Sequence, residues 1–395
     1  MNQGNYIFSQ LLGFVPKDVF DRIVKKYEGN KYVKSFSCWN QFCVMVYAQL
    51  AERESLRDLE SVLMHHQSCL HHMGMGSKVA KSTLAYANMT RDPEIFREMA
   101  LKLVKIARDL RIGRCAELDE YIDGDVYAFD STTLSLCLSQ FPWLKLHHEK
   151  AGVKVHTLLD VKTDVPAFFI YTEATLHDSM VMDEIPYVAG SYYVFDRAYM
   201  VSQKLYKIHN AHAFFVVREK VHMKFKIVEN RTVKENSGVI ADQIIRLAGT
   251  QTRTQYPENI RRVTYHDAES GRDFVFYTNS IEEVSAEVLA LLYRYRWRVE
   301  LFFKWMKQHL HIKEFFGHNE NAIQIQIYTA IAAYCIVAIV EQRLKLGRDM
   351  YDVLRVLQGS LYEKIPLREF FKEGEKWQIA TDDLEFDELQ LMLNF

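Results

Sequence analysis

Proline and glycine are scarce in this chain of 395 residues, with 7 and 16 copies. So few breakers exclude a collagen-like chain and a linker-rich or disordered one, and 49% apolar residues can build a large core. The length allows two or three domains, or one large core with an insertion. No internal repeat or low-complexity tract divides the sequence.

Cysteine is also sparse, because only six are present and none forms a C-x-x-C pair. That density excludes a disulfide scaffold. The first residues lack a basic segment followed by an apolar one, so we expect no secretory signal and a cytoplasmic location. Several cysteines and histidines of the front could suggest a zinc site: Cys38, Cys43, His65, His66, Cys69, His71 and His72. Their spacing is not that of a common zinc finger, and we favour buried thiols as the interpretation of the cysteines.

A strong net charge is missing, since 49 basic and 51 acidic side chains leave −2. This near balance argues against a strongly basic nucleic-acid coat protein. The distribution is uneven, however. Residues 1–114 hold 17 basic and 11 acidic side chains, whereas residues 381–395 hold five acids and no base.

Charged residues are absent from 321–340, a stretch long enough to span a bilayer. Polar side chains such as Gln324, Gln326 and Thr329 interrupt it, and a charged run follows directly. We therefore expect a buried core helix and no membrane association.

The order of sequence patterns predicts an α/β protein with a mixed sheet flanked by helices, a β-rich insertion and an all-helical front. Apolar residues recur at helical spacing in 1–114, and short runs rich in Val, Tyr and Phe begin near 120. We predict these segments: a helical domain over 1–114, an α/β part over 115–212, a β-rich insertion over 213–284, closing helices over 285–345 and a helical region with an acidic tail over 346–395.

The helical front has the layout of a helix-turn-helix. A Gly-containing turn at 74–78 precedes a short helical run, STLAYANMTR, that begins at Lys81 or Ser82. Its exposed face would offer Lys78, Lys81, Asn88 and Arg91. An ordinary helical hairpin with solvated charges explains the pattern equally well.

Two aspartates end apolar, strand-like runs: Asp130 ends VYAFD and Asp196 ends YYVFD. Burying a lone charge is costly unless a cation pairs with it. Two carboxylates at the edge of a sheet could hold a divalent metal, because Mg²⁺ prefers oxygen ligands. The alternative is that each aspartate caps the turn that follows it.

Residues 288–316 predict one long helix that ends before Gly317. Four polar residues fall at offsets 0, +3, +7 and +14, which is one stripe of a helix: Tyr293, Arg296, Glu300 and Lys307. Lys304 shares this stripe. A carboxylate among cations suits a metal–phosphate site. Salt bridges between residues four apart on a solvated face are the alternative.

The spacing Y-x2-R-x3-E-x6-K in the predicted helix 288–316 resembles the Y-R-E-K signature of DDE transposases of the family-four bacterial insertion sequences. FDST at 129–132 and FDRAY at 195–199 are similar to the family's two aspartate motifs. The β-rich stretch between Asp196 and Glu300 resembles the insertion that these enzymes place before their third acid. The likeness covers about residues 115–345.

This resemblance implies an RNase H-like core in which Asp130, Asp196 and Glu300 bind Mg²⁺, with Mn²⁺ as a possible substitute. It implies DNA phosphate contacts by Tyr293, Arg296 and Lys307, and more weakly by Lys304. Trp297 could stack on a distorted end base or belong to the core. The front domain would contact the transposon end, with Lys81 and Arg91 as candidates.

The implied activity is metal-dependent cleavage of double-stranded DNA at the ends of an insertion sequence, and joining of the freed 3′-OH to target DNA. A homodimer is implied because two ends must be paired, with 346–395 as the expected contact. A DNA-binding regulator without catalysis and a nuclease without strand transfer remain alternatives.

Arg197 and Tyr199 stay open between DNA contact and packing. In the pair His177–Asp178, Asp178 either caps the helix that follows or supports the metal site. We expect DNA backbone contact from a basic cluster at the start of the insertion, with a solvated edge as the alternative: Arg218, Lys220, Lys224 and Lys226.

Overall fold

The computed structural model describes residues 5–76, 78–113, 115–136, 151–220, 223–310 and 315–378. The chain divides into two compact units. One combines Met1–Leu103 with His309–Phe395 and is called the helical unit here; the other, Val104–Gln308, is called the sheet unit. The helical unit is therefore built from both ends of the chain. The acidic stretch 381–395 lies outside the described residues.

The described residues of the helical unit form α13 and several shorter helices. Their bounds are α1 (Ile7–Leu12), α2 (Lys17–Lys26), α3 (Cys38–Leu50), α4 (Leu56–His65), α5 (Gln67–Leu70), α6 (Lys81–Thr90), α13 (Glu320–Leu344), α14 (Met350–Gln358) and α15 (Leu367–Gln378). Helix α7 (Glu94–Leu110) begins in this unit and ends in the other.

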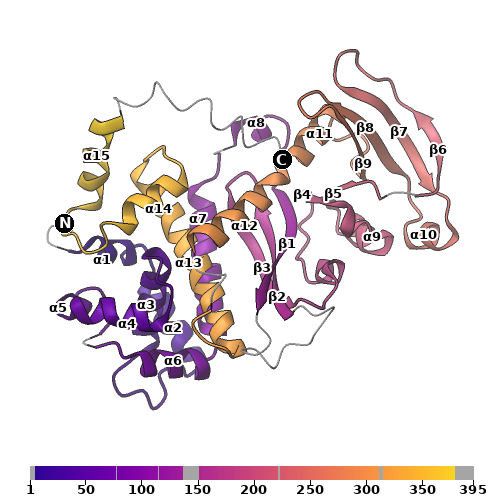
Figure 1. The fold of residues 1–395 in the computed structure, drawn as a ribbon. Helices are drawn as coiled ribbons and strands as arrows, with labels where there is room; N and C mark the ends of the chain where they lie inside the picture. Colours follow the sequence, from indigo (N-terminus) through magenta and orange to yellow (C-terminus); the bar gives the residue numbers. More distant parts are fainter. Residues whose placement is uncertain are drawn as a thin grey trace. The chain divides into compact units, whose positions relative to one another are not determined.

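Helix α13 is the core of the helical unit (Figure 1). The Asn319 side chain caps its start, and it packs against α3, α6 and α14. Its most apolar window is long enough to cross a membrane but is 94% buried in protein. The expected core helix is therefore confirmed. The assignment of 285–345 to the catalytic core stays a prediction; in the structure α13 is grouped with the helical unit and packs against α3 and α6 of the N-terminal part and against α14.

The predicted helix after the glycine turn is present as α6, but the predicted exposed face needs correction. Asn88 is only 1% exposed, and its amide oxygen accepts a hydrogen bond from Gln41. Arg91, just after the helix, donates to the backbone carbonyl of Ser37 and to the Gln41 side chain. Lys81 remains exposed at the first turn.

In its described residues the sheet unit contains nine strands: β1 (Val126–Leu136), β2 (Ala151–Asp160), β3 (Val165–Glu173), β4 (Tyr192–Phe195), β5 (Phe214–Arg218), β6 (Phe225–Asn230), β7 (Val239–Leu247), β8 (Ile260–Asp267) and β9 (Arg272–Thr278). Its helices are α8 (Ala116–Asp119), α9 (Ser202–Asn210), α10 (Thr250–Gln255), α11 (Ala286–Tyr295) and α12 (Trp297–His309), with 3₁₀ turns η1 (Asp178–Asp183) and η2 (Arg197–Tyr199).

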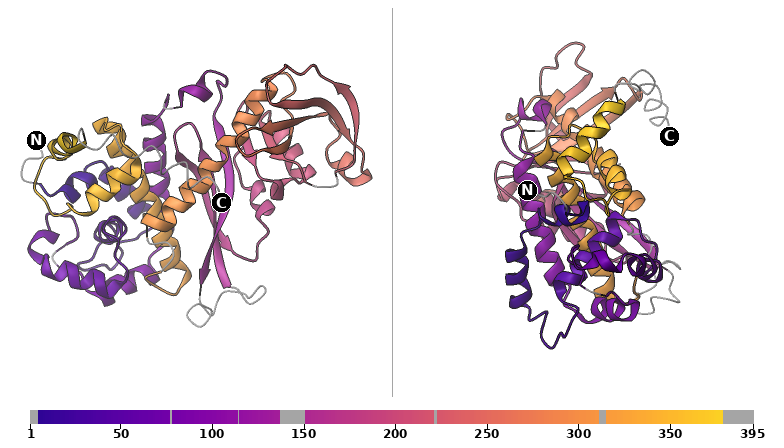
Figure 2. Two further views of the ribbon diagram at one scale, coloured as in Figure 1. Left: turned by 45° about the horizontal axis from the view of Figure 1, so that its top comes forward. Right: turned by 90° about the vertical axis from the view of Figure 1, so that its left-hand side faces the viewer.

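The strands form one sheet in the order β3-β2-β1-β4-β5-β9-β8-β7-β6 (Figure 1 and Figure 2). Strands β1, β2 and β3 are antiparallel neighbours, whereas β4 and β5 run parallel to β1. These five strands have the order and directions of an RNase H-like core, which confirms the predicted fold class. Buried aromatic residues of this sheet form the main apolar cluster, including Phe129, Tyr193 and Phe195.

Strands β6 to β9 are the β-rich insertion, and they extend the core sheet because β9 pairs with β5. Strands β8 and β9 form a hairpin: they pair up to Asp267 and Arg272, and Gly271 turns the chain with a φ of +62°. The predicted boundary at 213 differs from the structure. Residues 214–218 pair with β4 and complete the core, so the added strands begin at Phe225.

The predicted single helix over 288–316 is two helices, α11 and α12. The Ser285 side chain caps α11. At the junction, the amide of Arg296 donates to Tyr293 and its carbonyl accepts from Val299, which are bonds between residues three apart. This tighter turn separates the helices and places the side chain of Arg296 at the break.

Candidate active site

Asp130 and Asp196 lie side by side because their strands are parallel neighbours. Phe129 of β1 pairs with Phe195 of β4, so the aspartates that follow them, Asp130 and Asp196, lie at the same level along the two strands. Asp130 was predicted to end its strand, but β1 continues to Leu136. The physical reason is its other neighbour: β2 pairs with β1 past this point, with Thr157 opposite Asp130.

Glu300 joins the two aspartates through the side chains at the α11–α12 junction. The guanidinium of Arg296 lies 3.5 Å from an Asp130 carboxylate oxygen and donates a hydrogen bond to Glu300. The phenol of Tyr293 donates to Asp196 over 3.2 Å. Since Arg296 also lies over the Tyr293 ring, four elements, β1, the end of β4, α11 and α12, contribute to one side-chain network that includes all three acids.

The electrostatics of Asp130 reflect this crowding. Burial raises the pKa of the Asp130 carboxyl to about 6, with the nearby charges of Glu300 and Asp196 acting in the same direction. The backbone amide of Ser131, 2.8 Å from a carboxylate oxygen, and the charge of Arg296 oppose that rise. A carboxyl group perturbed in this way by burial and neighbouring charges is a candidate for a functional site.

Comparison with known proteins assigns the family. A family model described as "Transposase DDE domain" matches residues 122–336, which is more than half of the chain. The chain belongs to the DDE transposase family. A second model, a domain of unknown function (DUF4372), matches residues 3–76.

Curated relatives carry consistent names. The chain is 34% identical over 217 residues to a protein named as a transposase, y4zB, of Sinorhizobium fredii. It is 35% identical over 212 residues to one named as a transposase for insertion sequence element IS5377 of Geobacillus stearothermophilus. These matches cover 54% and 53% of this chain but only 59% and 54% of the relatives, so the chain spans little more than half their length.

Two further likenesses are more distant. A protein named as a transposase for insertion sequence element IS4SA of Synechocystis is 28% identical over 303 residues, which is 75% of this chain and 82% of that protein. A solved structure titled as the piggyBac transposase synaptic complex with hairpin DNA shows 12% identity and a TM-score of 0.47. That likeness covers 95% of this chain and 82% of the other.

DDE transposases use divalent metal ions, and the donor set of this chain fits such an ion. Three carboxylates supply the oxygen ligands that hard cations prefer. Among the described residues, however, no three acidic, histidine or cysteine side chains converge on one point. Asp130 and Glu300 instead each form an ion pair with the guanidinium of Arg296.

The predicted DNA-contacting residues of this DDE transposase lie in different surroundings. Trp297 is 53% exposed and so is not part of the core. Two further candidates are also exposed: Lys304 in α12 and Arg197 at the start of η2. Lys307 is half-buried. Of the residues left open between DNA contact and packing, Tyr199 is buried.

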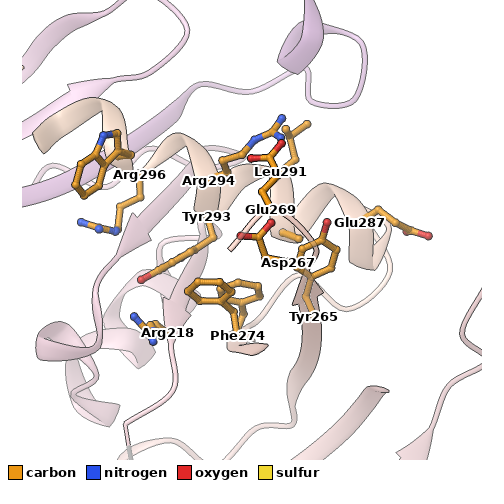
Figure 3. A pocket seen from close by; sticks show the side chains of 13 residues that line it. Arg218, Tyr265, Asp267, Glu269, Phe274, Glu287, Leu291, Tyr293, Arg294 and Arg296 are labelled. Carbon is orange, nitrogen blue, oxygen red and sulfur yellow. The ribbon is translucent and has the colours of Figure 1, made fainter. Parts of the chain in front are cut away.

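A pocket of about 530 Å³ adjoins the junction of α11 and α12, and its aromatic wall was not predicted from the sequence (Figure 3). Phe274 and Phe276 of β9 form that wall, and the Phe276 ring centroid lies 4.7 Å from that of Tyr293. Arg218 lies over the Phe274 ring at 5.0 Å. Alternation in the run RDFVFYT could have placed both phenylalanines on one face, but nothing local links that face to Tyr293.

The predicted pair His177–Asp178 lies at the start of η1, where the imidazole of His177 accepts from the Ser179 amide. Asp178 does not act as a simple helix cap. Its carboxylate forms an ion pair with Lys154 at 2.9 Å and lies 4.0 Å from the fully buried His156. The predicted cysteine–histidine cluster in the front forms no metal-binding group among the described residues. Cys38 instead donates to the Gly29 carbonyl.

Proposed function

We propose that this chain is a DNA transposase that binds the terminal inverted repeats of an insertion sequence, cleaves at the ends and joins the freed 3′-OH to target DNA. The observation that supports this most is that Arg296 contacts both Asp130 and Glu300, while Tyr293, whose ring lies under the Arg296 guanidinium, donates to Asp196. In this proposal the protein acts in the bacterial cytoplasm, where it binds the DNA of the nucleoid.

In this proposal Asp130, Asp196 and Glu300 hold two Mg²⁺ ions, or Mn²⁺ in their place. Bound there, the ions would activate the attacking water and stabilise the leaving 3′ oxygen. Arg296 would give up its contacts with Asp130 and Glu300 in the metal-bound protein, and its guanidinium would then be available to a phosphate beside the scissile bond. No covalent intermediate with the enzyme is needed, because water and then the 3′-OH are the nucleophiles.

Other residues would position the DNA. Lys304 and Lys307 add positive charge along α12, and Arg197 adds it after β4, where they neutralise phosphates. The exposed Trp297 next to the aromatic pocket would stack on a distorted end base. Lys81, and to a lesser extent Arg91 with its backbone bonds, would contact the transposon end from the front domain.

The decisive experiment compares Glu300→Gln with the wild type on a duplex that carries the element's terminal repeat. We expect the variant to retain DNA binding and lose Mg²⁺-dependent nicking, because one metal ligand loses its charge. Glu235→Gln, at an exposed turn, is the control and should cut normally. A Glu300→Gln variant that cuts at the wild-type rate would refute the triad.

Two alternatives have their own outcomes in this assay. A folded wild-type protein that binds the repeat but never cuts would be a regulator. A protein that cuts but forms no joined product from pre-cut ends would be a nuclease without strand transfer. The proposed homodimer, with 346–395 as its contact, is tested by light scattering of the DNA complex.

A further inference from the structure

A groove of about 560 Å³ lies in the helical unit between the loop at 27–36 and one face of α6, and it is called the α6 groove here. Each of its two walls carries an exposed aromatic side chain. Tyr32 of the loop is 91% exposed, and Tyr86 of α6 is 65% exposed. Single exposed aromatic residues are ordinary, but two of them that line one groove indicate a contact surface.

The loop wall has a defined and unusual conformation. The Asn30 side chain accepts from the amide of Cys38 over 2.8 Å, and the Asn30 carbonyl accepts from the amide of Val33 over 3.1 Å. Within this frame Tyr32 has a φ of +60°, a backbone conformation that bulky side chains rarely adopt. Such strain occurs preferentially at functional sites. An exposed tyrosine held in this conformation therefore suggests a role outside the fold itself.

Side-chain contacts hold the helix wall against the loop wall. Arg91, directly after α6, donates to the backbone carbonyls of Phe36 and Ser37. Its guanidinium carbon lies 5.6 Å from the centre of the Phe36 ring. The end of α6 is also fixed on its other side, because the Asn319 side chain donates to the Met89 carbonyl over 2.9 Å. The α6 groove is therefore a preformed feature of the fold.

The charges around the α6 groove favour a polyanion. Residues 25–36 and 78–92 hold seven basic side chains and two acidic ones. Both acids have partners, since Glu28 pairs with Lys31 at 2.6 Å and Asp92 accepts from the amide of Glu94 over 2.9 Å. Lys34 is exposed and has no acidic partner in the part of the chain that the structure describes. DNA is the partner that matches this excess of positive charge.

We propose that the α6 groove is the surface of the helical unit that reads the terminal repeat, with α6 in the major groove of the duplex. An α-helix fits the major groove, so the exposed Thr83 and Tyr86 of α6 contact base edges there. Tyr32 and Lys34 of the loop contact sugar and phosphate of the flanking strand. The inference rests on the proposed function, and it replaces the predicted reading face, on which Asn88 is buried.

Fluorescence anisotropy of the full chain tests this with two duplexes of equal composition, one with the terminal repeat and one with its sequence scrambled. Tyr86→Ala should raise the Kd for the repeat about tenfold and leave the Kd for the scrambled duplex nearly unchanged, because base contacts carry the specificity. Lys34→Gln should weaken binding of both duplexes equally and lower the salt slope by about one. Tyr32→Asn, which tolerates positive φ, should also weaken both.

Lys105→Gln and Tyr121→Ala are the matched controls, because both side chains are exposed outside the α6 groove, and both variants should bind as the wild type does. Thermal unfolding checks that each variant is folded. Groove variants that bind both duplexes like the wild type would overturn the inference. If Tyr32→Asn instead changes the mass of the DNA-free protein in light scattering, the groove contacts a second copy and the inference also fails. A wild type that binds both duplexes equally would refute the proposed recognition of the repeat itself.

Discussion

Arg296 lies between two acids that would repel each other without it. Its side chain is only 12% exposed, and its guanidinium contacts Asp130 and Glu300 at once. In a partly buried site, a cation in this place offsets part of the repulsion between carboxylates. If Asp130 and Glu300 bind a divalent ion as proposed, these contacts must be given up, and Arg296 would compete with the metal.

Arg296→Gln therefore should bind Mn²⁺ more tightly and cut DNA more slowly. If about 1.4 kcal/mol of competing interaction is lost, the Mn²⁺ affinity rises about tenfold. Calorimetric titration with Mn²⁺ measures the first effect, and the nicking assay measures the second. Weaker Mn²⁺ binding by the variant would show that the guanidinium supports the metal site instead.

Asp242 and Arg261 form a second, fully enclosed ion pair in the insertion. Their closest atoms are 2.8 Å apart, and the side chains are 7% and 3% exposed. Asp242→Asn should lower the free energy of unfolding of the sheet unit by about 3–5 kcal/mol, because a buried guanidinium would remain uncompensated. Urea denaturation followed by fluorescence measures this. Replacing both residues by Leu and Met should cost less than the single change; a larger loss would contradict the explanation.

At the scale of elements, the sequence predicted the patterns that depend on neighbours along the chain. The strand runs before Asp130 and Asp196 and the α6 helix follow from local periodicity and turn residues. The break at Arg296 could not be predicted, because helical residues continue on both sides of it. The wall of Phe274 and Phe276 depends on a sheet pairing across many residues, and no local signal specifies it.

The antiparallel pair β2–β3 holds an imidazole that should govern acid stability. His156 is fully buried, and one ring nitrogen lies 2.9 Å from the Thr172 hydroxyl. Burial lowers the pKa of His156 to about 4, the charge of Lys154 adds to this effect, and the carboxylate of Asp178 opposes it. The neutral ring is thus the form that fits the folded sheet.

Because the folded-state pKa lies below the unfolded value, the unfolded chain binds the proton first as the pH falls. The stabilisation is complete above about pH 6.5 and is lost progressively toward pH 4, at about 1.4 kcal/mol for each pH unit. His156→Gln should therefore lose less stability than the wild type across this window. Thermal unfolding at steps of pH tests it, and parallel curves for both proteins would contradict the assignment.

At the scale of the whole molecule, two units with separate cores should respond separately to ligands and mutations. Ile336 in α13 is fully buried, so Ile336→Ala should cost about 2–5 kcal/mol in the helical unit. Mg²⁺ should instead stabilise the sheet unit, where the three carboxylates lie. Differential scanning calorimetry should show each change in a different transition. A single transition that moves with both would show that the units unfold together.

The construction of the helical unit from both chain ends has a consequence during translation. Helix α3 leaves the ribosome early, but its partner α13 begins about 270 residues later. At bacterial synthesis rates of roughly 5–20 residues per second, α3 is synthesised tens of seconds before α13. During that time the apolar face of α3 that packs against α13 is uncovered. Chaperones would have to shield it during that time. A message cut short before α13 would yield an unprotected fragment that proteases remove, so a decayed gene copy would produce no folded competitor for the transposon ends.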